Sequence, residues 1–102
     1  MLGSMDHWWA DHRNWMEPRV DEAPSFYFRR QFWATFEDDR AGVLTRELIG
    51  VDRLMWGSDY PHTEGTFPYS QEQVMKDFLG VPEEEVYKMV VGNAASLYGL
   101  SV

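Results

Sequence analysis

The sequence predicts an α/β protein with about two parallel strands and four to five helices. The segment Ser25–Phe36 alternates side chains with a period of two and is rich in aromatic residues, which is typical of a strand. The segment Leu54–Trp56 is a short apolar run without alternation, as expected of a strand that is covered on both faces in a parallel sheet. Helical patterns lie before, between and after these segments, and strands that alternate with helices indicate βαβ units.

The first element is predicted to be a helix over Met5–Met16. One face of it carries residues at helical spacing: Met5, Trp8, Trp9, His12 and Met16. Pro18 is expected to end it. His7 and Asp11 could share a face, but two ligands are too few for a closed metal site, so packed or solvated histidines are the better interpretation. Met1–Ser4 precede a second methionine and are interpreted as a candidate cloning remnant.

A helix is expected between the two strands. Either Asp38 or Asp39 would cap it, and Gly50 can close it.

Three short helices are expected after the second strand and its loop. Ser70 and Gln73 would form a capping box for the first of them. Pro82 would open the second, with Gly92 at its end, and Asn93 would cap the third.

Composition limits the class of protein. The 102 residues are enough for one domain, taken here as residues 1–102, and 44% of them are hydrophobic, so the chain is built to pack. A net charge of −8 disfavours nucleic-acid binding. No apolar run approaches the ~20 residues of a membrane helix, and no secretory signal is present, so a cytoplasmic protein without a membrane partner is expected. Because the chain has no cysteine, thiolate metal sites and disulfides are excluded.

The chain contains three stretches that are specific in combination: FRRQFWATFEDDRAGV, IGVDRLMWGSDYPHTEGTFPYS and VVGNAASLYGL. Together they resemble the C-terminal end of the metal-dependent amidohydrolase-related family, which includes aminocarboxymuconate-semialdehyde-decarboxylase-like enzymes. The resemblance implies a TIM (β/α)8 barrel, a fold of roughly 250 residues. This chain would be an incomplete C-terminal portion, with Ser25–Phe36 as the seventh strand and Leu54–Ser58 as the eighth. The histidines of the family's metal site belong to the part of the barrel without a counterpart here.

The same resemblance implies a site at Asp59. Active sites of such barrels lie at the C-terminal ends of the strands, and Asp59 directly follows the second strand. It would be a catalytic residue. Its carboxylate would act either as a ligand of a divalent metal, with zinc as the expected ion, or as a base for metal-bound water. His62 would lie on the side of the substrate, a small carboxylate or carbonyl compound. A plainer interpretation is that Ser58 and Asp59 form an Asx-turn or a cap.

Two hypotheses for function follow. In the first, the chain is the C-terminal part of a metal-dependent hydrolase or decarboxylase. By itself it would be inactive and would hold no metal, because a catalytic zinc usually takes three protein ligands plus water. In the second, it is a non-catalytic α/β module that associates with itself, since a two-stranded sheet leaves both edges open and exposed rings need cover. Both hypotheses suggest a homo-oligomer.

Overall fold

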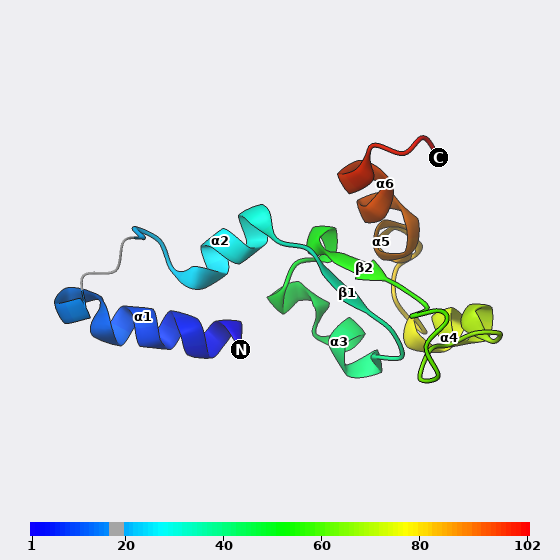
Figure 1. Ribbon diagram of the computed structural model, residues 1–102, viewed down its shortest axis with the longest axis horizontal. Coiled ribbons are helices and arrows are strands. Elements are labelled where there is room, and N and C mark those ends of the chain that lie inside the picture. The colour runs from blue at the N-terminus through cyan, green and yellow to red at the C-terminus, as the bar shows by residue number, and fades with distance from the viewer. Residues whose placement is uncertain (17–19) are drawn as a thin grey trace. The chain divides into compact units, whose positions relative to one another are not determined.

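The computed structural model describes residues 1–16 and 20–102. The chain divides into two compact units, Met1–Trp33 and Ala34–Val102 (Figure 1). Each unit is described by itself. The expected helix end at Pro18 lies outside the described residues.

The first unit contains two helices, α1 (Leu2–Met16) and α2 (Pro24–Gln31). The predicted helix over Met5–Met16 is confirmed and begins three residues earlier. Asp6 of α1 accepts a hydrogen bond of 2.8 Å from the backbone N–H of Ser25, so the carboxylate satisfies a free amide in the first turn of α2. Hydrogen bonds from the side chain and from the backbone of Ser25 lower the pKa of Asp6 below its ordinary value.

The predicted strand over Ser25–Phe36 is wrong for most of its length, because Pro24–Gln31 is helical. Pro24 occupies the first turn, where its missing N–H costs nothing. The guanidinium of Arg30 lies 5.4 Å from the ring of Phe26 and 5.1 Å from that of Tyr27. Contacts at i+4 and i+3 are typical of helical geometry, in which these positions are neighbours. The alternating pattern therefore lies mostly in a helix, and only its last three residues, Ala34–Phe36, form a strand.

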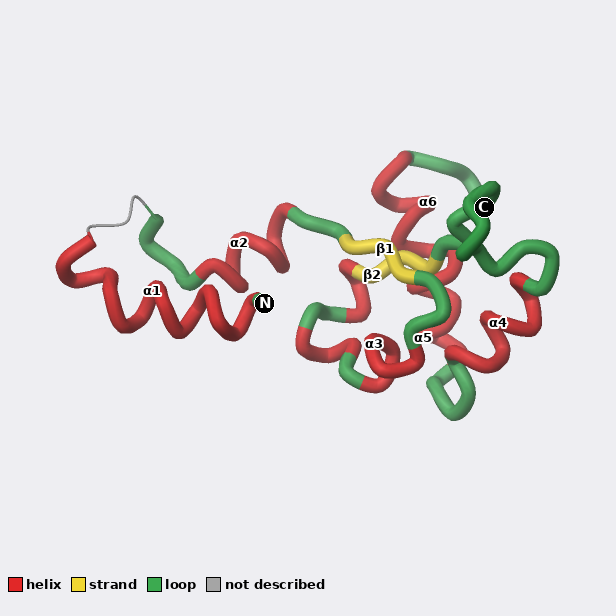
Figure 2. Tube along the Cα trace, turned by 60° about the horizontal axis from the view of Figure 1, so that its bottom comes forward, coloured by secondary structure: helices red, strands yellow, loops and turns green. Residues whose placement is uncertain are grey.

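The second unit is built on two short parallel strands, β1 (Ala34–Phe36) and β2 (Leu54–Trp56). Ala34 pairs with Leu54 and Phe36 with Trp56, and the two arrows run side by side in Figure 1. The backbone N–H of Gly57 donates to the carbonyl of Phe36 at 2.9 Å, which extends the pairing past the end of β2. Two parallel strands with surrounding helices confirm the predicted α/β class (Figure 2).

The segment between the strands is less regular than expected. Helix α3 (Arg40–Leu44) begins at Asp39, whose Oδ1 accepts from the N–H of Gly42 at 2.8 Å, so capping by Asp39 is confirmed. The helix ends at Leu44 and not at Gly50. Two short 3₁₀ turns follow, η1 (Arg46–Leu48) and η2 (Val51–Arg53). Gly50 lies between them with φ of +113°, a conformation that only glycine adopts readily.

The last two predicted helices are one continuous helical segment. It consists of α5 (Glu83–Tyr87), a π-helical turn η3 (Lys88–Gly92) and α6 (Asn93–Tyr98). Gly92 and Asn93 both have right-handed helical backbone angles, so an end at Gly92 and a cap at Asn93 are wrong. Asn93 is instead buried, and its Nδ2 donates to the carbonyls of Val51 at 2.7 Å and Leu54 at 2.8 Å. The helix therefore uses this side chain to hold the start of β2.

The predicted capping box of helix α4 (Ser70–Asp77) does not form. Ser70 lies inside the helix, and its Oγ pairs with Oγ1 of Thr66 at 2.8 Å. Gln73 turns toward other partners, Asp38 and Asp77.

The core of the second unit is small. Four buried side chains form its centre: Val43, Leu54, Phe78 and Met89. They come from α3, β2, the residue after α4 and η3, so helical segments before and after β2 meet at this strand. Many large apolar side chains stay exposed, among them Leu44, Leu48, Phe67, Met75, Leu79 and Tyr98. Within the described residues, no helix is both long and apolar enough to span a membrane.

Candidate functional site

Asp59 lies just beyond the carboxyl end of β2, where the sequence placed it. It is exposed and has a left-handed backbone with φ of +54°, a conformation that aspartate tolerates better than most residues. The plainer interpretation, a turn formed by Ser58 and Asp59, is confirmed for Ser58, because the N–H of Tyr60 approaches Oγ of Ser58 at 3.3 Å. In this contact the acceptor is the hydroxyl of Ser58 and not the carboxylate of Asp59.

The loop after β2 closes on itself and fixes Asp59. The N–H of His62 donates to the carbonyl of Asp59 at 2.8 Å, and the N–H of Thr66 donates to the carbonyl of Ser58 at 2.9 Å. A Cβ atom on Gly65 would lie 2.7 Å from the carbonyl oxygen of Ser58 and 3.0 Å from that of Asp59. Only glycine fits this closure, which explains the residue at that point of the loop.

A second carboxyl group lies at the same edge of the sheet. Glu37 directly follows β1, as Asp59 follows β2, and parallel strands bring their carboxyl ends together. Glu37 and Asp59 line one depression of about 240 Å³, together with Thr35, Phe36 and Gly57. We call this depression the strand-end pocket.

Glu37 is the more shielded of the two acids. Within the described part of the chain, its Oε2 is covered and accepts no hydrogen bond. Burial raises the pKa of the Glu37 carboxyl above its ordinary value of 4.5. The negative charge of Asp59 raises this pKa further. An oxygen that is shielded from water without a donor is a place where a bound group can supply the missing partner.

Other charged side chains surround this pair. Glu64 and Asp38 also raise the pKa of Glu37, whereas His62 lowers it. His62 is exposed on the loop, within electrostatic reach of Glu37, so it lies near the acids but does not line the strand-end pocket.

The residues at this edge do not make a complete metal site. Among residues 1–16 and 20–102, no group of three or more histidine and acidic side chains is placed to hold an ion. A catalytic zinc needs about three protein ligands. Asp59 and Glu37 could each supply one carboxylate oxygen, and the remaining ligands are not formed by the described chain. His7 and Asp11 pair with each other at 2.9 Å on the surface of α1.

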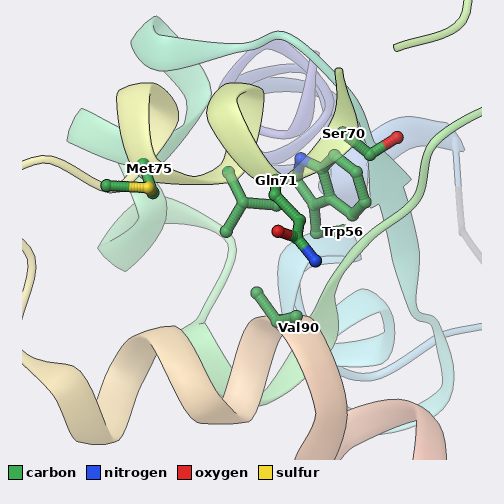
Figure 3. Close-up of a pocket in the computed structure, with 6 residues that line it drawn as sticks. Trp56, Ser70, Gln71, Met75 and Val90 are labelled. Atoms are coloured by element: carbon green, nitrogen blue, oxygen red, sulfur yellow. The ribbon is translucent and has the colours of Figure 1, made fainter. Parts of the chain in front are cut away.

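A larger pocket of about 410 Å³ lies elsewhere in the second unit (Figure 3). Figure 3 shows Trp56 and Gln71 on one side of it and Val90 of η3 on the other. The remaining lining residues are Ser70, Val74 and Met75. Its lining is nearly all apolar and contains no titratable group. Size alone would favour this pocket, but the acids of the strand-end pocket make that smaller depression the candidate for chemistry.

Residues 2–100 match the family model for amidohydrolases. The chain belongs to this amidohydrolase family, which confirms the resemblance found in its motifs.

Among solved structures, the chain is similar to the 5-carboxyvanillate decarboxylase LigW from Sphingomonas paucimobilis, with a TM-score of 0.81 and 24% sequence identity. The match covers 98% of this chain and 30% of that chain. The chain thus has the fold of one part of a TIM barrel. No curated protein sequence matches it.

Glu37 was not predicted from the sequence. The neighbouring Asp38 and Asp39 were assigned to helix capping, which is correct for Asp39. Asp59 was identified through the family resemblance, which places it after the second strand. Glu37 directly follows the first strand, so the same comparison of strand ends also applies to it.

The raised pKa of Glu37 gives a test by pH. The folded protein binds this proton more tightly than the unfolded chain, so the carboxyl group favours folding below pH 4.5, and this contribution is lost as the pH rises through the folded-state pKa. We therefore expect the free energy of unfolding of Glu37→Gln to rise relative to wild type between about pH 4 and about pH 7. Urea denaturation at a series of pH values measures this difference. Glu22→Gln removes an exposed carboxylate from the first unit and serves as the control. If the difference in free energy of unfolding between Glu37→Gln and wild type stays constant with pH, the raised pKa of Glu37 is contradicted.

Proposed function

We propose that the chain forms the C-terminal part of the catalytic mouth of a metal-dependent amidohydrolase-type hydrolase or decarboxylase. One observation carries this proposal: Asp59 and Glu37 follow two paired parallel strands and line one pocket at their carboxyl ends. Catalytic residues of barrel enzymes come from the ends of several strands at this face.

Within this proposal, Asp59 is the residue that contributes to catalysis. Its carboxylate is exposed, its backbone is fixed by the closed loop, and it is free to accept a proton or to bind a cation. A divalent metal, with zinc as the expected ion, would supply Lewis-acid chemistry in the intact enzyme. The other ligands of that metal would come from parts of a barrel that this chain does not contain.

The substrate class proposed for the intact enzyme is a small carboxylate or carbonyl compound. His62, exposed on the loop beside the acids, is proposed to face it. The solved relative is named for its action on 5-carboxyvanillate, which is a carboxylate. The chain spans about 30% of that relative's length, so activity is a property proposed for the larger assembly.

We expect the chain alone to be inactive, because two carboxylates cannot hold a catalytic zinc. The test is a panel of carboxylate and amide substrates with added Zn²⁺ or Mn²⁺. A chimera in which this chain replaces the matching part of the decarboxylase then tests the role of Asp59. In the folded chimera, Asp59→Asn should weaken binding of Zn²⁺ roughly 10-fold or more in calorimetry.

Asp52→Asn is the matched control, since Asp52 lies before β2 and Asp59 after it. Metal-dependent turnover by the chain alone that vanishes in Asp59→Asn would contradict the expected inactivity. Equal zinc affinity of the Asp59→Asn and Asp52→Asn chimeras would contradict the role of Asp59 as a metal ligand.

A second proposal is that the chain associates with itself. It is supported by the small core, the two three-residue strands and the exposed apolar side chains of the second unit, such as Leu48 at 68% and Leu79 at 72% exposure. A pair of open strand edges is a template for further pairing, and a homo-oligomer would cover both edges and side chains.

We expect sedimentation velocity at micromolar concentration to show a dimer or a larger species. The midpoint of urea unfolding should also rise with protein concentration, because association stabilises the folded state by mass action. A compact monomer with a midpoint independent of concentration would contradict self-association and leave the first proposal standing.

A further inference from the structure

One glutamine joins two acids on different elements of the second unit. The side-chain amide of Gln73, on α4, donates to Oδ1 of Asp38 at 2.8 Å and to Oδ1 of Asp77 at 2.8 Å. An amide nitrogen has two hydrogens and no charge, so it can serve two carboxylates at once. The two acids therefore lie within two hydrogen-bond lengths of each other, separated only by the glutamine nitrogen.

Asp77 is the fixed end of this connection. It is only 1% exposed, although it is an acid. Its Oδ2 accepts a long hydrogen bond of 3.4 Å from the indole Nε1 of Trp56, and its backbone carbonyl accepts one of 2.7 Å from Arg40. A buried carboxylate requires such donors, because an unpaired one is strongly disfavoured. A packed acid with several partners is a rigid anchor.

The partners of this anchor come from both strand ends. Asp38 is the residue after Glu37 and has a left-handed backbone with φ of +37°. Arg40, two residues further on, is tied to the same anchor. Trp56 is the last residue of β2 and precedes the turn that carries Asp59. The connections Asp38–Gln73–Asp77 and Asp77–Trp56 therefore link the residue after Glu37 to the last residue of β2.

We propose that Gln73 and Asp77 are positioning residues that fix the separation of Glu37 and Asp59 across the strand-end pocket. Neither residue lines that pocket, so both act through their neighbours. The proposal deepens the proposed function, in which these two acids form part of the mouth. Its physical basis is that the turn at Asp38, in a conformation unfavourable for most residues, accepts a hydrogen bond from Gln73, and the same amide of Gln73 also bonds to the buried Asp77.

The lack of cysteine in the chain makes the separation measurable without any activity. In the double variant with Glu37→Cys and Asp59→Cys, equilibration with glutathione gives the effective concentration of the two thiols. Adding Gln73→Met should lower this effective concentration about ten-fold, because the end of β1 is no longer held. Gln71→Met, at an exposed position of the same helix, is the matched control and should leave it unchanged.

A merely structural role would lower the melting temperature of Gln73→Met but leave the effective concentration in the folded protein as in the Gln71→Met control. That result would overturn the proposal. If Gln73→Met does not fold, exposed Asp38 offers the same test, since Asp38→Asn keeps the acceptor oxygen and Asp38→Ala removes it. An effective concentration that is unchanged in Asp38→Asn and lowered in Asp38→Ala supports the proposal. Equal effective concentrations in the two variants overturn it. The thiol measurement does not depend on metal or turnover, so its failure is distinct from a failure of the proposed function.

Discussion

The side chain of Asn93 is the contact on which the second unit depends. Its amide donates two short hydrogen bonds to carbonyls at the start of β2 and just before it, from a position that is 8% exposed. Leaving the buried carbonyl of Leu54 without a donor would cost roughly 1–3 kcal/mol, and the partly buried carbonyl of Val51 would add less. Asn93 belongs to the long C-terminal helical segment. These bonds therefore attach β2 to that segment independently of the pairing between β2 and β1.

The position of the candidate site follows from this attachment. With β2 held, the parallel register of Ala34 with Leu54 sets which residues leave the sheet together. Glu37 and Asp59 then emerge at the same edge, and the loop closed by Gly65 keeps Asp59 there. The chemistry of the site thus depends on a strand pair of three residues each, which is marginal by itself and needs the surrounding helices.

The sequence was sufficient for the features that have a local chemical signature. The apolar run Leu54–Trp56, the cap at Asp39 and the acid at the end of β2 are all where the residue types indicated. The family motifs also led to the barrel fold, which spacing alone could not distinguish from other α/β arrangements. The exact roles of Asp59 and His62 stay predictions, since no contact in the described residues tests them.

The errors arose where tertiary contacts outweigh local preference. Pro24–Gln31 lies in a segment with a period of two, yet it is a helix, and the carboxylate of Asp6, nineteen residues before Ser25, satisfies an amide of its first turn. Asn93 resembles a cap, yet its amide is used by backbone carbonyls about forty residues earlier in the chain. Gln73 similarly leaves the capping box for Asp38 and Asp77. Such long-range partners have no pattern in a single sequence.

The most direct test of the central claim is hydrogen exchange of the Gly57 amide, which bonds to the carbonyl of Phe36 beyond the end of β2. If Asn93 holds the strand pair, this amide is protected in the wild-type protein and loses most of its protection in Asn93→Ala, while Asn14→Ala, an exposed change in α1, has no effect. Unchanged protection of Gly57 in a folded Asn93→Ala variant would contradict the account.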